Sequence, residues 1–190
     1  AKAFVKGEVA NTDEALQGAR DIIAERVNEN ERSRQTVRRS FECTGMIRSK
    51  VVKGKEAEAG KFRDYFDWSE PLKRCTSHRL LAMRRGEAEG YLRVSISPSD
   101  DDDCISRVER GYVKAGTPAA AQVEMAIADA YKRLLKPSIE TEFAGASKGK
   151  ADEEAIHVFA NNLKQLLLAA PLGQKRIMGI DPGFRTGCKV

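Results

Sequence analysis

The sequence KFRDYFDWSEPLKRCTSHRLLAMRRGEAEG, at residues 61–90, holds the only tryptophan of the chain, Trp68, with Tyr65 and two phenylalanines close by. Aromatic residues make up only 6% of the chain, and each buries about 150–250 Å² when it enters a core. A chain with so few rings is expected to build its core where they are concentrated. The stretch therefore predicts a two-helix corner in which Trp68, Tyr65 and His78 are structural residues and internal ion pairs join the helices.

The same stretch offers no catalytic group. Ser77 and His78 are adjacent, and neighbouring side chains on a helix point apart, so they cannot act as nucleophile and base. Cys75 and His78 lie three residues apart, but no second pair of ligands accompanies them, which argues against a metal site. We expect His78 and Arg79 to bind nearby acidic residues instead.

Composition narrows the class of protein. The chain has 190 residues, of which 41% are hydrophobic and 32% charged, and it contains neither the ~18-residue apolar run of a membrane span nor an N-terminal signal peptide. The cysteines are widely spaced and form no CxxC pair, so we expect reduced thiols, a cytoplasmic protein and no cofactor. They are Cys43, Cys75, Cys104 and Cys188. Both ends of the chain look cut, which predicts a piece of a longer protein.

Positive charge is concentrated between residues 30 and 55, where eight basic residues face two acidic ones, within a chain of net charge +5. Four of these basic residues are arginines on or beside one expected helix, which begins at Asn30 or Ser33 and ends at about residue 41. This surface is either a solvated helix face or a surface that contacts nucleic-acid phosphates without reading bases. The candidate phosphate-binding residues are Arg32, Arg34, Arg38 and Arg39.

The remaining pattern predicts a mainly α-helical fold. Asn11 and Glu14 have the spacing of a capping box at the start of a helix. Residues 46–52 and 91–96 read as a small two-stranded β element. Pro137 is expected to end one helix, and residues 138–170 to form a long C-terminal helix with its buried face at Ile156, Phe159, Leu163, Leu166 and Leu167.

Asp181 is the one residue that raises a question of catalysis. Residues 176–181 read as a buried strand that ends in this aspartate, followed by the glycine-rich turn DPGFRTG. RNase H-like nucleases begin in this way, with the aspartate as one ligand of a metal pair that needs further carboxylates. Because those carboxylates are missing here, we expect no metal site and no nuclease activity in this chain. Asp181 is otherwise a turn residue.

Five ordered motifs resemble the central region of the bacterial transcription accessory protein Tex family. They are the stretch at residues 61–90, ALQGARDIIAE (15–25), DAYKRLLKPSIETE (129–142), ADEEAIHVFANNLKQLLLAAPLG (151–173) and IDPGFRTGCKV (180–190). The resemblance implies a helical core domain at residues 1–173 that leads into a truncated YqgF domain of RNase H-like fold at residues 174–190. It also implies a cytoplasmic protein that acts in transcription and binds nucleic acid, RNA more than DNA.

Three functional hypotheses follow. The first is a non-catalytic helical scaffold whose basic surface contributes to nucleic-acid binding, with the transcription machinery as a further partner. The second is part of an RNase H-like or resolvase-type nuclease, with Asp181 as a metal ligand in the whole protein. The third is a scaffold for protein interactions alone, whose arginines are only solvated. None of them involves a membrane or a small-molecule substrate.

Overall fold

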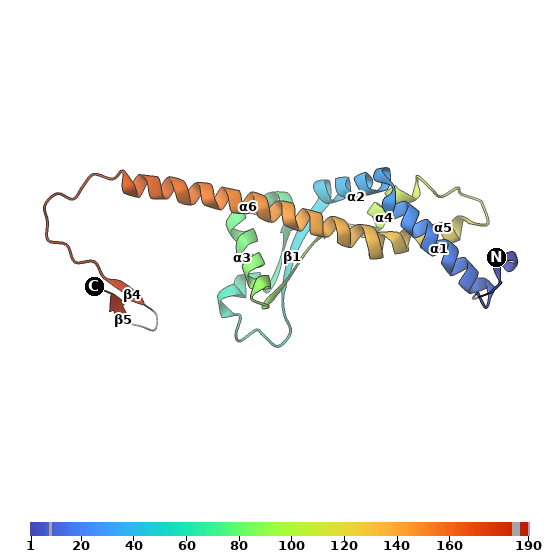
Figure 1. Ribbon diagram of the computed structural model, residues 1–190, viewed down its shortest axis with the longest axis horizontal. Helices are drawn as coiled ribbons and strands as arrows, with labels where there is room; N and C mark the ends of the chain where they lie inside the picture. The colour runs from blue at the N-terminus through green and yellow to red at the C-terminus, as the bar shows by residue number, and fades with distance from the viewer. Residues whose placement is uncertain (8, 184–186, 190) are drawn as a thin grey trace. The chain divides into compact units, whose positions relative to one another are not determined.

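The structure is a computed structural model that describes residues 1–7, 9–183 and 187–189 (Figure 1). It contains two compact units, Ala1–Ala155 and Ile156–Val190. The first unit holds nearly all of the regular structure. Its elements are η1 (Lys2–Phe4), α1 (Thr12–Glu29), α2 (Glu31–Thr44), β1 (Gly45–Val51), η2 (Gly60–Tyr65), β2 (Asp67–Pro71), η3 (Leu72–Arg74), α3 (Ser77–Ala88), β3 (Leu92–Pro98), α4 (Asp101–Glu109), α5 (Ala120–Asp129) and η4 (Ala130–Leu135).

The C-terminal helix α6 (Lys136–Leu167) begins in the first unit and ends in the second, where β4 (Asp181–Gly183) and β5 (Gly187–Lys189) follow. The mainly helical fold with a long C-terminal helix is therefore confirmed. Along the described residues, no helix combines the length and the apolar character needed to cross a membrane.

Two asparagines set the first helices. Asn11 accepts hydrogen bonds from the backbone N–H groups of Asp13 and Glu14, and Glu14 accepts one from Ala10 N at 2.8 Å. This is the expected capping box. Asn30 ends α1 and also caps α2, because its Oδ1 accepts from Ser33 N at 3.0 Å. A single residue therefore fixes the corner between α1 and α2.

The sheet of the first unit has three antiparallel strands in the order β2-β1-β3. The expected pairing of β1 with β3 is present, with Ile47 opposite Ile96, but the two-stranded expectation is corrected by the third strand, β2. On the outer side of β3, the N–H groups of Val94 and Ile96 donate to the carboxylates of Glu87 and Glu140 at 3.3 and 2.8 Å. Side chains thus satisfy the edge of the sheet.

The aromatic stretch at residues 61–90 is not a two-helix corner. It forms the 3₁₀ helix η2, the strand β2, a short turn of 3₁₀ helix and α3. Trp68 lies on β2 opposite Ser49 and is half-buried, with its ring 6.0 Å from Tyr65 in an edge-on arrangement. Its Nε1 donates to Glu70 at 3.0 Å. The stretch packs against the core as expected, but half of it enters through a strand because β1 offers a partner.

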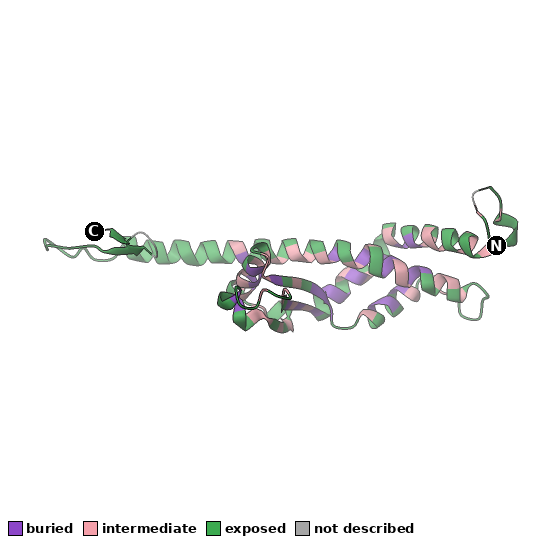
Figure 2. Ribbon diagram, turned by 90° about the horizontal axis from the view of Figure 1, so that it is seen from below, coloured by how far each residue is buried: buried purple, intermediate pink, exposed green. Residues whose placement is uncertain are grey.

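The core lies where the sheet meets the helices of the first unit, and Figure 2 shows buried residues concentrated there. The largest fully buried side chains come from α1, α2, α3, α4, the strands β1 and β3, and the α5–η4–α6 helix. They include Val27, Val37, Phe41, Ile47, Met83, Ile96, Cys104, Ile127, Tyr131, Leu135 and Ile139. A core drawn from so many segments explains why residues 1–155 form one unit.

Gly86 lets α3 approach the sheet closely. A Cβ at this position would lie 2.6 Å from Leu92 Cδ1 and 3.2 Å from Phe62 Cδ1. Both distances are shorter than ordinary carbon contacts, so the space above Gly86 belongs to Leu92 and Phe62. Gly145 and Gly149, in contrast, lie on α6 with open space where their Cβ atoms would be.

The expected helix end at Pro137 is wrong. The chain stays helical from Ala120 to Leu167, and residues 130–135, just before the proline, form a π-helix. A proline lacks an N–H group and its ring crowds the carbonyl four residues earlier. The wider π-helical turn leaves room for that ring, so the helix passes the proline. The single long helix expected at residues 138–170 is confirmed, with its end at Leu167.

The second unit corrects two further expectations. The apolar side chains of α6 that were expected to be buried are exposed: Ile156, Phe159, Leu163, Leu166 and Leu167. This unit supplies only a segment without helix or strand and a short hairpin, which leaves them little to pack against (Figure 2). The strand expected at residues 176–181 begins only at Asp181, where β4 pairs with β5. The centre of the expected turn, residues 184–186, lies outside the described residues.

A carboxylate ties α4 to the long helix. The hydroxyl of the fully buried Tyr131 donates to Asp101 Oδ1 at 2.6 Å, and Lys136 Nζ bonds the other carboxylate oxygen. Burial alone raises the pKa of Asp101, but the two hydrogen bonds, together with the positive charges of Lys136 and Arg48, outweigh it and leave the pKa below its ordinary value. Asp101 is therefore ionised in the folded protein at neutral pH.

We expect Gly86→Ala to lower the free energy of unfolding by about 1–3 kcal/mol, because its methyl group overpacks the contact between α3 and β3. Gly145→Ala, the matched control, is expected to raise it by about 0.5–1 kcal/mol, because alanine favours an exposed helix. Urea unfolding followed by circular dichroism measures both. Equal stability of Gly86→Ala and the parent would show that the two elements separate freely.

We expect Asp101→Asn to lower the free energy of unfolding by about 1 kcal/mol at neutral pH, a modest value because the carboxylate is partly solvated. The folded-state pKa lies below the unfolded one, so the contribution of Asp101 is complete above about pH 4 and is lost as the pH falls through the folded-state value. The difference between variant and parent should therefore shrink toward acid. A difference that stays constant between neutral and acid pH would contradict this account.

Candidate nucleic-acid interface

Helix α2 carries the four arginines predicted as phosphate contacts. Its inner face is formed by Ser33, Val37, Ser40 and Phe41, all buried. The arginines occupy the rest of the helix, and the structure separates them into two pairs with different surroundings.

Arg34 and Arg38 hold α2 on α6. Arg34 donates to Asn28 Oδ1 at 3.1 Å and to Ser138 Oγ at 2.8 Å. Arg38 Nε lies 2.8 and 3.0 Å from the two carboxylate oxygens of Glu142, and this hydrogen bond raises the pKa of Arg38. Each guanidinium group thus has partners within the fold, and the charge of Arg38 is partly neutralised by Glu142, which makes both arginines weaker candidates for a phosphate contact.

Arg32 and Arg39 are exposed on the outer part of the same helix. Within the part of the chain that the structure describes, neither side chain takes part in a hydrogen bond or an ion pair. An arginine in this setting keeps all five N–H donors available for a phosphate. The predicted set of four is thus divided into two arginines that bond other residues of the fold and two exposed ones that do not within the described residues.

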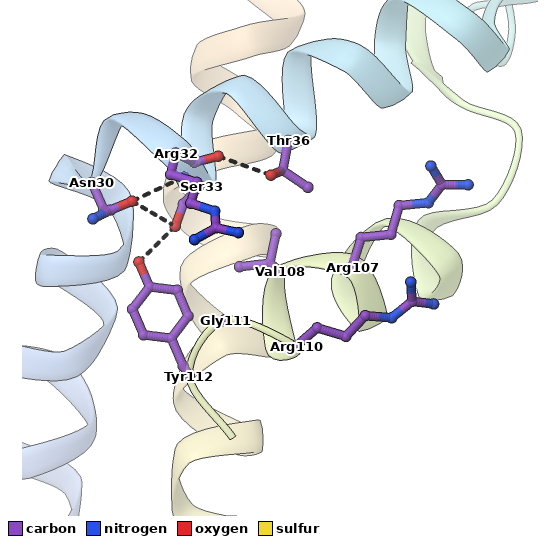
Figure 3. Close-up of a pocket in the computed structure, with 9 residues that line it drawn as sticks. All are labelled: Asn30, Arg32, Ser33, Thr36, Arg107, Val108, Arg110, Gly111 and Tyr112. Carbon is purple, nitrogen blue, oxygen red and sulfur yellow. Dashed lines mark hydrogen bonds between the residues drawn. The ribbon is translucent and has the colours of Figure 1, made fainter. Parts of the chain in front are cut away.

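A cleft lies beside Arg32, between the start of α2 and the end of α4 (Figure 3). It has a volume of about 370 Å³. Two more arginines line it, Arg107 from the last turns of α4 and Arg110 from the position directly after α4 (Figure 3). The other lining residues are Asn30, Ser33, Thr36, Val108, Gly111 and Tyr112.

Arg107 and Arg110 were not singled out from the sequence. The charged residues that stand out at α4 are the four aspartates at its start, where Asp100 caps the first turn. The signal was nevertheless present, because a spacing of three places Arg107 and Arg110 on one face of a helix. Arg107 Nε lies 2.8 Å from Asp103 Oδ2, which neutralises part of its charge. Both side chains are exposed.

The residues expected to be structural lie apart from this cleft. Trp68 and Tyr65 are half-buried, and Arg79 lies 5.6 Å above the Trp68 ring and bonds Glu70 at 3.0 Å. The expected pairing of Arg79 with an acid is therefore present. His78 is exposed, and its Nε2 lies 3.4 Å from Thr76 Oγ1 in place of the acidic partner expected for it. Its structural role stays a prediction.

The groups considered for chemistry give no reactive arrangement. Burial, reinforced by Glu70, raises the pKa of the Cys75 thiol to about 12, so this cysteine is protonated and a poor nucleophile at neutral pH. Asp181 is exposed on β4 and pairs in register with Lys189. Across residues 1–7, 9–183 and 187–189, no group of three or more His, Cys, Asp or Glu side chains is placed to hold a metal ion.

Comparison with known proteins places the chain. A family profile described as Tex central region-like matches residues 1–159. The chain belongs to the Tex family. It is 41% identical to Protein tex of Bordetella pertussis, over 93% of this chain and 24% of that protein, and 36% identical to the transcriptional accessory protein Tex of Neisseria gonorrhoeae, over 100% of this chain and 26% of that protein.

The name of a more distant relative includes an RNA-binding domain. The chain is 29% identical to S1 RNA-binding domain-containing protein 1 of Pongo abelii, over 91% of this chain and 19% of that protein. The chain spans about a quarter of the length of its Tex relatives. What those whole proteins do is therefore a matter of proposal for this Tex segment.

The division of the α2 arginines predicts different effects on stability. Arg38→Ala is expected to lower the free energy of unfolding by up to about 1 kcal/mol, since it breaks a partly solvated ion pair, while Arg39→Ala should change it by less than about 0.5 kcal/mol. Chemical unfolding measures both. A double-mutant cycle with Glu142→Ala isolates the pair, and zero coupling would contradict the assignment of Arg38.

Proposed function

We propose that this chain is a non-catalytic helical scaffold of a transcription accessory protein and that its basic surface binds the phosphate backbone of nucleic acid, RNA more than DNA. The observation that carries the proposal is the exposed pair on α2, Arg32 and Arg39, on a helix whose other two arginines bond residues of α6. The bonds of Arg34 and Arg38 hold α2 in place on α6, and the helix backbone that carries Arg32 and Arg39 is thereby fixed.

The relatives support the choice of partner. One is named as a transcriptional accessory protein and another as an S1 RNA-binding domain-containing protein. Phosphate contacts suit both RNA and DNA, because they hold a strand without reading its bases. The transcription machinery is the further partner that we propose, in the cytoplasm.

We assign no catalytic step to the chain. The proposed domain boundary lies after residue 173, and residues 174–190 would begin an RNase H-like domain in the whole protein. In the nuclease hypothesis Asp181 binds a metal ion there together with carboxylates from other segments. Cleavage by the whole protein that is unchanged by Asp181→Asn would remove that aspartate from the metal site.

The proposed contacts predict salt-dependent binding. Each phosphate neutralised on a single strand contributes about −0.7 to the slope of log K against log salt concentration. We expect the chain to bind a labelled single-stranded RNA at low salt, and Arg32→Ala/Arg39→Ala to weaken binding and flatten the slope by about 1.4. Fluorescence anisotropy across a salt series gives both quantities.

Arg63→Ala serves as the control, since Arg63 is exposed on η2 and does not line the cleft. Loss of one such charge should leave the slope within error. Absence of binding by the parent chain at low salt would refute the proposal and favour the protein-interaction scaffold, whose arginines are only solvated.

A further inference from the structure

We propose that the cleft between α2 and α4 is a phosphate-binding site for the nucleic-acid backbone, in which Arg107 and Arg110 act together with Arg32. This inference rests on the proposed function and assigns a defined place and two new residues to it. Three of the nine described residues that line the cleft are arginines, and none of the nine is acidic.

The geometry brings the three charges to one hollow from two elements. Figure 3 shows Arg107, on α4, and Arg110, just after its end, extending to the same side, while Arg32 extends from the first turn of α2 into the space between the helices. Val108, between the two α4 arginines in sequence, is buried and forms an apolar floor. A floor of this kind restricts water beneath the guanidinium groups and strengthens their attraction for an anion.

The cleft is held in shape without help from a ligand. The hydroxyl of Tyr112 lies 2.7 Å from Ser33 Oγ, which joins the turn after α4 to the first turn of α2. The same turn is closed by backbone hydrogen bonds from Gly111 N to Val108 O at 3.0 Å and from Tyr112 N to Glu109 O at 2.9 Å. Arg110 is therefore carried by a segment that is fixed at both sides, which lowers the entropy lost on binding.

The three arginines of the cleft differ in how far nearby acidic residues neutralise their charge. Arg107 uses only its Nε in the ion pair with Asp103, so its terminal amino groups still face outward with a reduced net charge. Arg32 and Arg110 take part in no ion pair within the described residues. These two should contribute most to phosphate binding, and Arg107 less.

Size favours a backbone phosphate with part of its sugar over an isolated ion. Cavities that hold small organic ligands measure about 300–1,000 Å³, and this cleft lies at the lower end of that range. The three arginines that line it are exposed, as contact with a strand that continues in both directions requires. A free phosphate would share the same contacts, so the experiment must separate the two.

The test uses the 190-residue chain, labelled single-stranded RNA and anisotropy over a salt series. Arg110→Ala is expected to weaken binding about tenfold at low salt and to flatten the salt slope by about 0.7, because one phosphate contact is lost. Arg107→Ala should do the same to a smaller degree, and Arg110→Lys should retain the slope while losing the paired donors. Arg63→Ala remains the matched control.

Tyr112→Phe gives a second, charge-neutral readout. Loss of the bond to Ser33 loosens the cleft, so the affinity should fall severalfold while the salt slope stays unchanged. Thermal unfolding of every variant shows that the fold is retained. If Arg110→Ala and Tyr112→Phe both bind RNA as the parent does, while Arg32→Ala/Arg39→Ala does not, the cleft is overturned and the proposed function stands.

Inorganic pyrophosphate distinguishes the source of the phosphate. Competition by pyrophosphate only at concentrations far above those of RNA supports a backbone site. Tight binding of pyrophosphate that Arg110→Ala abolishes, with RNA binding unchanged, would overturn the backbone assignment in favour of a small-anion site. Failure of the parent chain to bind RNA at all would overturn the proposed function and this inference together.

Discussion

The position of α4 depends on the carboxylate of Asp101, which accepts hydrogen bonds from the hydroxyl of Tyr131 and the ammonium group of Lys136. Both donors lie where the long helix passes through its π-helical turn. The opposite end of α4 is joined to α2 by the contact between Tyr112 and Ser33. A nine-residue helix has little stability of its own, so these two attachments, together with the burial of Cys104, Ile105 and Val108 in the core, determine where its last turn lies and with it the cleft that the turn lines.

The arginines of α2 show that the same type of side chain can have two different roles on one helix. Arg38 and its partner Glu142 are separated by 104 residues in the chain, and the ion pair forms only because α2 lies along α6. Arg39, one residue further on, points to solvent. A count of charges along the sequence assigns both Arg38 and Arg39 to one basic surface. Only packing shows that one of them stabilises the helix pair while the other is available to a ligand.

Local signals in the sequence predicted the elements that depend on local physics. The capping box at Asn11, the pairing of β1 with β3 and the long C-terminal helix all follow from spacing and propensity. The strand β2 escaped prediction because five residues ending in a proline form a strand only beside a partner. The continuation of the helix past Pro137 was not predicted. It is possible because the wider π-helical turn before the proline accommodates the ring that would otherwise crowd a backbone carbonyl. The α4 arginines of the cleft needed the tertiary fold to bring them to Arg32.

The hydrogen bonds from Val94 and Ile96 to glutamates have a consequence for association between molecules. An edge strand with unoccupied N–H groups is a template for a strand from another chain. In β3 those donors already bind the carboxylates of Glu87 and Glu140, supplied by α3 and α6. On the other edge, β2 ends at Pro71, which has no N–H to give. The β3 edge therefore offers few free N–H groups to a strand from another molecule, so association through this edge is disfavoured.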